Sequence, residues 1–451
     1  MADQGIRPRP LAILFVAILC VALGLALVLA ILAQQNRLPE AGPLGSLFAA
    51  DQQGSRQAWL ALGGAVLACF CLSAVALRWA APGHDPLILA AVFMLSGLGL
   101  ILLVRLSPEV AAARRQAHLA GMAGRQAGFI LAGLAVMVAA AWLTRPSLLA
   151  RLARRRYFYA LLAVLLILAT GLFGREINGR RLWIPLGPLT LQTVEIAKIL
   201  VVLFAAGYFA ERRAYLKSTP GDRTAHMARV QVLGPFLATV GFCLLPIFFQ
   251  GDLGPTLLLT LLMVVTFYMG GGRGWWALAA LGAVAAVAAV AYQAGWPSMV
   301  RTRLDMWLAP FAYSEVLSRA HWSVASGGLL GMGLGQGFSA KIPVVQSDFS
   351  FVVVCEELGL AGGLAVLGFY ALIVWRGLAA AARQPDAYRS LLAGGLVAML
   401  AIQALIIIGG NVGLLPLTGI TLPLVSYGGS SLLVGFAVMG VLIKLSSYPG
   451  K

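Results

Sequence analysis

Apolar residues dominate the chain in long runs, and short polar segments separate these runs. A run of about 20 apolar residues is long enough for a helix to cross the hydrocarbon core of a membrane. On this pattern we predict twelve membrane-spanning helices, at residues 11–33, 58–81, 86–105, 127–144, 157–173, 191–211, 232–249, 254–270, 275–293, 350–376, 390–409 and 424–446. The sequence therefore predicts an all-α, polytopic membrane protein.

The amino-acid composition supports this prediction and argues against several other classes of protein. With 60% hydrophobic and 11% charged residues and a mean hydropathy of +0.90, the chain has too little polar surface to cover a soluble globule. The net charge of +17 comes from Lys and Arg in short loops, where membrane orientation and lipid headgroups account for it. We expect membrane lipids and no nucleic acid as partners. None of the five cysteines stands in a metal-ligand spacing, so we expect no disulfide framework and no zinc site.

Basic residues also predict an orientation. The first apolar run is longer than a signal-peptide core and has no clear cleavage site after it, so we expect it to be retained. Basic clusters follow the fourth and sixth runs, which places both termini in the cytoplasm and residues 294–349 outside. Several outer-side residues have no role in orientation: Arg175, Arg180, Arg181, Arg301, Arg303, Arg319 and Lys341. They are either solvated loop charges or part of an outward-facing site for an anionic substrate.

The outer segment 294–349 is by far the longest connection, and long loops without predicted secondary structure are disproportionately functional. It contains a glycine-rich run, with Gly327, Gly328, Gly331, Gly333, Gly335 and Gly337. A phosphate-binding loop would need a preceding strand, and the pattern predicts none. We therefore expect re-entrant or closely packed membrane backbone.

Ionisable residues inside apolar runs are the first candidates for a site. Gln192, Glu195 and Lys198 share one face of the sixth predicted helix. The pair Glu195 and Lys198 either neutralises itself and fixes helix packing or faces a substrate groove, and we favour the groove. Asp252, in a Gly- and Pro-containing interruption, is either a helix cap or a site residue.

Two further segments carry polar residues in apolar surroundings. Asp348 and the adjacent Glu356 and Glu357 lead into the tenth predicted helix, and Asp348 is also in a position to cap it. Residues 411–431 are rich in Gly, Pro, Ser and Thr, which indicates irregular backbone. Such backbone is tolerated in a membrane only where it is buried in protein or lines a cavity.

These segments, in this order, resemble the SEDS family (shape, elongation, division and sporulation), the peptidoglycan glycosyltransferases of the RodA, FtsW and SpoVE type. The resemblance is carried by Asn178–Ile184 with Gln192, Glu195 and Lys198, then Gln250–Gly254, Glu356–Gly359, Pro416–Gly419 and Ser426–Ser431. It covers about residues 86–446, which implies a ten-helix core that includes the outer loop 294–349. Residues 1–85 are then an N-terminal extension with two helices, and residues 447–451 a cytoplasmic tail.

The resemblance implies polymerisation of lipid II, the undecaprenyl-pyrophosphate-linked precursor, at the outer face of the bacterial cytoplasmic membrane, with a class B penicillin-binding transpeptidase as partner. Arginines would stabilise the pyrophosphate leaving group. The implied substrate-binding residues are Arg180, Arg181, Trp183, Gln192, Glu195, Lys198, Asp252, Arg301, Arg303, Asp348, Glu356, Glu357, Ser426, Tyr427 and Ser430. Mg²⁺ or Mn²⁺ is compatible with a pyrophosphate site, although the sequence shows no closed metal cage.

The chain departs from the family pattern where a catalytic carboxylate is expected. The family usually carries an essential Asp in the outer loop, and here Tyr313 occupies that place. Val344 and Gln346 likewise replace a Glu and a His. A carboxylate must deprotonate the acceptor hydroxyl, and Glu315 is the nearest replacement, with Asp305 the second candidate.

Three functions remain open from the sequence. The first is an active lipid II polymerase with a rearranged base, in cell elongation and shape or in division. The second is a non-catalytic SEDS-like protein that binds lipid II or supports a transpeptidase. The third is a flippase for a lipid-linked precursor, although no internal repeat supports it.

Overall fold

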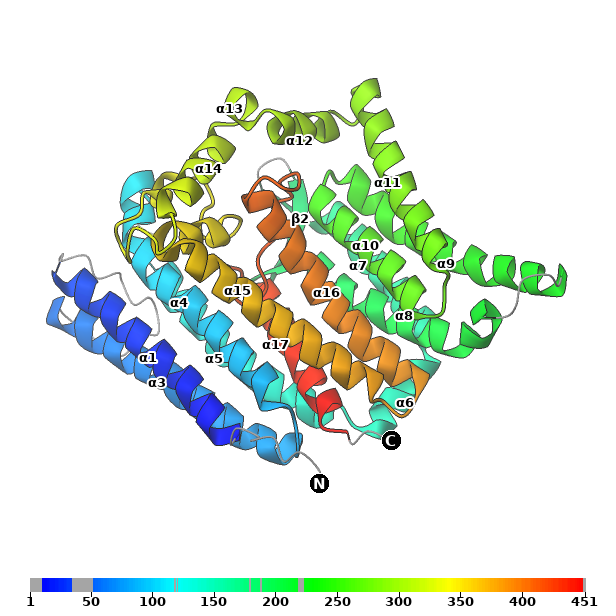
Figure 1. Ribbon diagram of the computed structural model, residues 1–451, viewed down its shortest axis with the longest axis horizontal. Coiled ribbons are helices and arrows are strands. Elements are labelled where there is room, and N and C mark those ends of the chain that lie inside the picture. The colour runs from blue at the N-terminus through cyan, green and yellow to red at the C-terminus, as the bar shows by residue number, and fades with distance from the viewer. Residues whose placement is uncertain are drawn as a thin grey trace. The chain divides into compact units, whose positions relative to one another are not determined.

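The computed structural model describes residues 10–34, 52–116, 119, 121–177, 180–186, 189–217 and 223–448. Figure 1 shows a chain built almost entirely of helices. Ten helices in these ranges are long and apolar enough to cross a membrane: α1 (Pro10–Gln34), α3 (Gln52–Ala80), α4 (Pro86–Arg114), α5 (Met122–Leu143), α7 (Arg156–Phe173), α8 (Thr193–Lys217), α11 (Gly274–Ala294), α15 (Ser350–Ala382), α16 (Ala387–Asn411) and α17 (Gly429–Ser446). The apolar helices α9 (Arg223–Phe249) and α10 (Leu253–Met269) complete the twelve predicted segments. The predicted all-α, multi-pass membrane fold is confirmed.

The connections hold more structure than the apolar pattern predicts. The outer segment contains α12 (Ser298–Leu308), α13 (Pro310–Tyr313), α14 (Glu315–Gly327) and a 3₁₀ turn, η2 (Ser339–Lys341). A short helix, α6 (Pro146–Arg154), lies between α5 and α7. The strands β1 (Arg175–Ile177), β2 (Arg180–Leu186) and β3 (Leu189–Gln192) form a small antiparallel sheet in the order β1-β2-β3. Most of these elements are shorter than the stretch over which a hydrophobic period can be recognised.

The chain folds into two compact units, each built from separate stretches of sequence. The first contains residues 1–142, 318–376 and 421–447, and the second contains 143–317, 377–420 and 448–451. The division of the sequence into an extension, a core and a tail stays a prediction.

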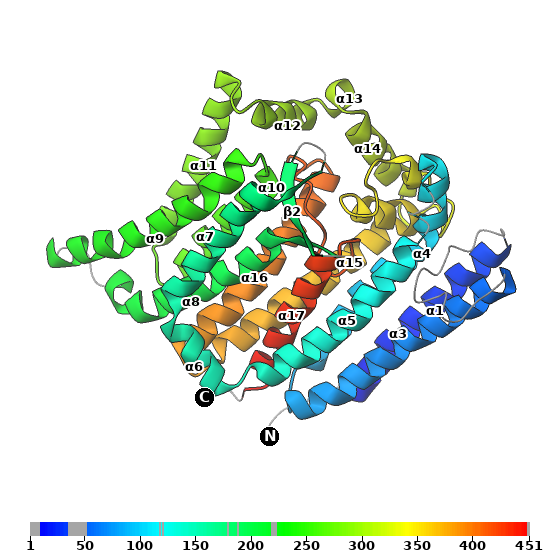
Figure 2. The ribbon, with the colours of Figure 1, turned by 180° about the vertical axis from the view of Figure 1, so that it is seen from behind.

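Small residues allow the helices of the first unit to pack closely. In both views α1 and α3 run alongside α4 (Figures 1 and 2). A Cβ on Gly97 would lie 2.4 Å from Val21 of α1, and one on Gly440 of α17 would lie 2.2 Å from the carbonyl oxygen of Met137. Close approach at Gly is the usual way for membrane helices to gain packing contacts.

The second unit has α8 and α16 at its centre, since most of both helices is buried. A Cβ on Gly395 would lie 2.8 Å from Val202, so a larger residue there would separate the two helices. Two turns further along α8, the ring of Phe209 contacts the rings of Phe236 on α9 and Phe267 on α10. By contrast, α11 buries little of its surface and is suited to face lipid.

Candidate functional site

The second unit holds a buried charge pair inside its helical core. Lys198 Nζ donates to Glu195 Oε2 at 2.8 Å and to Gln403 Oε1 of α16 at 2.7 Å. Glu195 and Lys198 are 7% and 3% exposed. Gln192 ends β3 immediately before α8 and is half-buried. The observed partners explain how a buried Lys is tolerated, because paired and hydrogen-bonded charges avoid most of the penalty of burial. The role of these residues in substrate binding stays a prediction.

Asp252 lies where two of the predicted motifs meet. It immediately precedes α10, yet its carboxylate makes no capping hydrogen bond, and the residue is only 5% exposed. A Cβ on Gly254 would lie 2.9 Å from the carbonyl oxygen of Thr418, so only glycine allows this approach. The segments 250–254 and 416–419 are therefore in direct contact. The Thr418 hydroxyl is buried there without a hydrogen-bond partner among the described residues.

The outer helix α12 carries three of the predicted residues. Arg303 Nη1 donates to the carbonyl oxygen of Leu417 at 2.5 Å. Asp305 accepts a hydrogen bond of 2.9 Å from the hydroxyl of Tyr292 on α11, and its other oxygen lies 3.9 Å from Nε of Arg301. Asp305 is about one quarter exposed, and the Arg301 side chain is 61% exposed. This carboxylate is therefore held in place and still reached by solvent.

Glu315 and Tyr313 lie further along the same outer segment. Tyr313 ends α13 and is 61% exposed, and Glu315 is the exposed first residue of α14. An acidic residue in the first turn stabilises a helix through the helix dipole, which gives Glu315 a structural reason to be acidic. Further along α14, burial lowers the pKa of His321.

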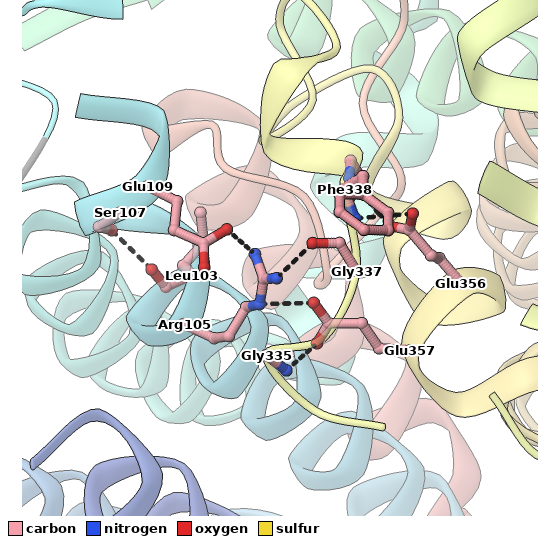
Figure 3. Close-up of polar contacts among 10 residues, drawn as sticks. Leu103, Arg105, Ser107, Glu109, Gly335, Gly337, Phe338, Glu356 and Glu357 are labelled. Atoms are coloured by element: carbon pink, nitrogen blue, oxygen red, sulfur yellow. Dashed lines mark hydrogen bonds and ion pairs between the residues drawn. The ribbon is translucent and has the colours of Figure 1, made fainter. Parts of the chain in front are cut away.

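In the first unit, Glu356 and Glu357 hold the glycine-rich segment (Figure 3). The two carboxylate oxygens of Glu356 accept from the backbone N–H groups of Phe338 and Ser339, both at 2.9 Å. Glu357 accepts from Gly335 N–H at 3.3 Å and pairs with Arg105 Nε at 2.5 Å. Both glutamates are 1% exposed. Each therefore already has partners within the protein, and the predicted contact with substrate stays a prediction.

Arg105 of α4 completes this network. Its guanidinium also donates to Glu109 Oε2 at 2.8 Å and to the carbonyl oxygen of Gly337 at 3.0 Å. The residue is only 2% exposed. Neither Arg105 nor Glu109 was predicted as a site residue, although an Arg at the end of an apolar run is a signal for a buried polar partner.

The backbone of α15 breaks at Gly359 to accommodate the glycine-rich segment. Gly359 has φ 67° and ψ −166°, outside the range of a helix. The carbonyls of Glu356 and Glu357 accept from Met332 and Gly333 N–H at 2.9 and 3.1 Å. The backbone N–H of Leu360 in turn donates to the carbonyl oxygen of Gly328 at 2.9 Å. The expectation of closely packed backbone in the glycine-rich run is confirmed, because each chain segment supplies hydrogen-bond partners that the other lacks.

The serine-rich segment before α17 is tied to the end of the outer loop. Ser426 Oγ lies 2.7 Å from Ser350 Oγ and donates to the carbonyl oxygen of Ser347 at 2.6 Å. The Tyr427 hydroxyl accepts from Arg125 Nε at 3.0 Å. Ser347 also donates to Asp348 Oδ1 at 2.7 Å. Ser430 lies half-buried in the first turn of α17.

The sheet carries the remaining candidates. Trp183 of β2 is half-buried and lies opposite Gln192 of β3 in the strand register. Asn178 and Gly179 lie outside the described residues, as do the side chains of Arg180 and Arg181, whose backbone belongs to β2. Within the described part of the chain, no group of three or more His, Cys, Asp or Glu side chains is placed to hold a metal ion.

Comparison with known proteins places this arrangement in a family. The FtsW/RodA/SpoVE model, described as a cell cycle protein, matches residues 86–450. The peptidoglycan glycosyltransferase RodA of Mycobacterium leprae is 34% identical over 383 residues, which cover 84% of this chain and 81% of that protein. A probable peptidoglycan glycosyltransferase FtsW of Nitrosococcus halophilus is 32% identical over 371 residues, covering 81% and 92%.

A solved structure agrees with the sequence relatives. A chain of a peptidoglycan synthase complex, whose structure concerns the coordination of polymerization and crosslinking, superposes with a TM-score of 0.63. It is 27% identical and covers 81% of this chain and 98% of its own length. The family model matches most of the chain, and the relatives are similar over most of their length. The chain therefore belongs to the FtsW/RodA/SpoVE family, which is the SEDS family.

Proposed function

We propose that this protein is a peptidoglycan glycosyltransferase that polymerises lipid II at the outer face of the bacterial cytoplasmic membrane. Its relatives are named for this activity, and its multi-pass fold is that of the family. Both termini then lie in the cytoplasm, and a class B penicillin-binding transpeptidase is the partner. The likeness to a chain of a synthase complex that coordinates polymerization with crosslinking supports such a partner.

The observation that carries the proposal is the carboxylate of Asp305 on the outer segment. The reaction joins an acceptor sugar hydroxyl to the donor sugar and breaks the donor's bond to its pyrophosphate, and a base must remove the hydroxyl proton. Tyr292 orients Asp305 by a hydrogen bond of 2.9 Å. Glu315 is closer in sequence to Tyr313, and it is the first residue of helix α14. We therefore assign the base to Asp305.

Arg301 would bind the pyrophosphate leaving group, and helix α11 would contact the lipid. The Arg301 side chain is 61% exposed one helical turn from Asp305, so its guanidinium is accessible to an anionic pyrophosphate beside the base. The exposed helix α11 presents an apolar surface to the lipid. Mg²⁺ or Mn²⁺ would neutralise further charge if it accompanies the pyrophosphate.

A second candidate function rests on Tyr313. A phenol that loses its proton near pH 10 is a weak base at neutral pH. If no other carboxylate substitutes, the protein binds lipid II or supports a transpeptidase without polymerising.

The test is incubation of purified protein with fluorescent lipid II, alone and with a cognate transpeptidase whose own crosslinking is blocked. Polymerised glycan in either reaction supports the enzyme. Binding of lipid II without polymer in both reactions favours the second candidate, and transport of lipid II across vesicles without polymer favours a flippase.

A further inference from the structure

Helix α12 has two functional faces. Arg303 and Trp307 are one turn apart, and both donate to backbone carbonyls of the segment that follows α16. Trp307 Nε1 donates to Gly413 at 2.9 Å and Arg303 to Leu417 at 2.5 Å. Arg301 and Asp305 are likewise one turn apart, and Asp305 accepts a hydrogen bond from Tyr292 of α11. At about 100° per residue, Asp305 points away from the face that Arg303 and Trp307 share.

The carbonyls that anchor α12 belong to a fixed segment. Gly413 has φ 78°, and the next residue, Leu414, donates its N–H to Gly409 of α16 at 2.8 Å. Further along, the close approach of Gly254 to Thr418 prevents the segment from shifting toward α10. Figures 1 and 2 both show the loop after α16 beneath α12. The acceptor oxygens are therefore a rigid reference for the position of α12.

Burial of apolar side chains contributes little to the position of this helix. In α12, which is described over its full length of 11 residues, Val300 is the only buried residue, and the N-cap residue Pro297 makes no side-chain capping hydrogen bond. A helix of this length is marginal by itself, and its position depends on tertiary contacts. The side-chain hydrogen bonds of Arg303, Trp307 and Asp305 therefore contribute much of what holds α12 in place.

We propose that Trp307 is a positioning residue, whose hydrogen bond to the Gly413 carbonyl orients α12 so that Asp305 meets the acceptor hydroxyl. This inference rests on the proposed function, because Asp305 is its base. Trp307 does not touch the substrate in this account. Its loss acts through Asp305, so it lowers the rate of the chemical step more than the affinity for lipid II.

The decisive variant is Trp307→Phe, which keeps a ring and removes the N–H donor. Loss of one such bond corresponds to about a tenfold effect, so we expect kcat to fall about tenfold and KM to change about twofold or less. Trp79→Phe is the matched control, since Trp79 lies on α3 and is 85% exposed. It should retain native kinetics.

A double variant separates positioning from general damage. In an Asp305→Asn background, Trp307→Phe should change the residual polymerisation rate by less than about twofold, because the group through which it acts is already gone. An equal tenfold loss in both backgrounds would overturn the proposal. So would a Trp307→Phe enzyme whose kcat stays within twofold of native.

Hydrogen exchange in detergent gives a readout that does not depend on catalysis. Trp307→Phe should raise amide exchange in residues 298–308 at least severalfold and leave residues 387–409 unchanged. Unchanged exchange in α12 contradicts the anchoring role whatever the activity. Absence of polymer from the native protein together with a loosened α12 in the variant would instead reject the proposed function and retain the anchor.

Discussion

Arg105 and Glu357 form an ion pair in which both side chains are almost completely excluded from solvent. Nε and Oε1 are 2.5 Å apart, with exposed fractions of 2% and 0% for the two side chains. The pair joins α4 to the break in α15 and, through the Gly335 and Gly337 backbone, to the glycine-rich segment. These two charges lie far apart in the sequence, so only the folded chain reveals them as partners.

Removal of Arg105 alone should be strongly destabilising. Arg105→Met removes the cation that pairs with the buried Glu357, and breaking a buried pair on one side costs about 3–5 kcal/mol. Thermal unfolding in detergent measures the loss. Arg151→Met on the exposed face of α6 is the control and should change stability by about 0.5 kcal/mol or less. A loss for Arg105→Met as small as that of the control would show that the network contributes little.

Glu195 and Lys198 should behave as a coupled pair. Replacing either by Met strands the other charge in the core, whereas replacing both removes the stranded charge. We therefore expect the double variant to be more stable than at least one single variant. A double-mutant cycle on thermal unfolding measures this coupling, and additive losses would show that the two residues are independent.

Gly254 should not tolerate a methyl group. The Cβ of Gly254→Ala would lie 2.6 Å from Ile420 and 2.9 Å from the Thr418 carbonyl oxygen, which is backbone and cannot rotate away. We expect a loss of about 1–3 kcal/mol from overpacking and a fall in polymerisation. Gly282→Ala in α11 is the matched control, because no atom lies within 4 Å of its Cβ position. That variant should be neutral or more stable, since Ala favours a helix. Equal behaviour of the two variants would contradict the close contact of the two motifs.

The outer segment should be accessible from outside the cell. In a cysteine-free background, Lys341→Cys should react with a membrane-impermeant maleimide in intact cells, and Arg151→Cys should react only after permeabilisation. Both positions are exposed, so a failure to label is not caused by burial. The opposite pattern would reverse the proposed orientation and remove the outward-facing site.

The sequence predicts the helices better than their partners. A run such as 390–409 is apolar enough to indicate α16, yet nothing in it shows that Gln403 receives a hydrogen bond from Lys198. The same holds for Arg105 and Glu357, because pairing between distant helices leaves no local pattern. The sheet at Arg175–Gln192 and the helices of the outer segment are short and held by tertiary contacts, so hydrophobic periodicity does not reveal them.

The sequence also identifies candidate site residues without revealing their partners in the fold. Glu356 and Glu357 stand out in the sequence as adjacent acids at an apolar run, and the structure shows them bound to backbone N–H groups and Arg105. Proximity in sequence to Tyr313 favours Glu315, whereas the proposed assignment to Asp305 rests on its hydrogen bond to Tyr292 of the neighbouring helix. Tyr292 could not be foreseen, because its hydroxyl reaches Asp305 only after the chain turns from α11 into α12.

The measurement that tests the central claim most directly is lipid II polymerisation by three purified proteins, the native chain, Asp305→Asn and Glu315→Gln, each with the transpeptidase partner. Both substitutions keep the shape of the side chain and remove the base. The account predicts that Asp305→Asn lowers the rate on the order of 10²-fold or more with unchanged thermal stability, while Glu315→Gln stays within a few fold of native. Full activity of Asp305→Asn would contradict the assignment of the base to Asp305. If Glu315→Gln were inactive in the same experiment, Glu315 would be the base.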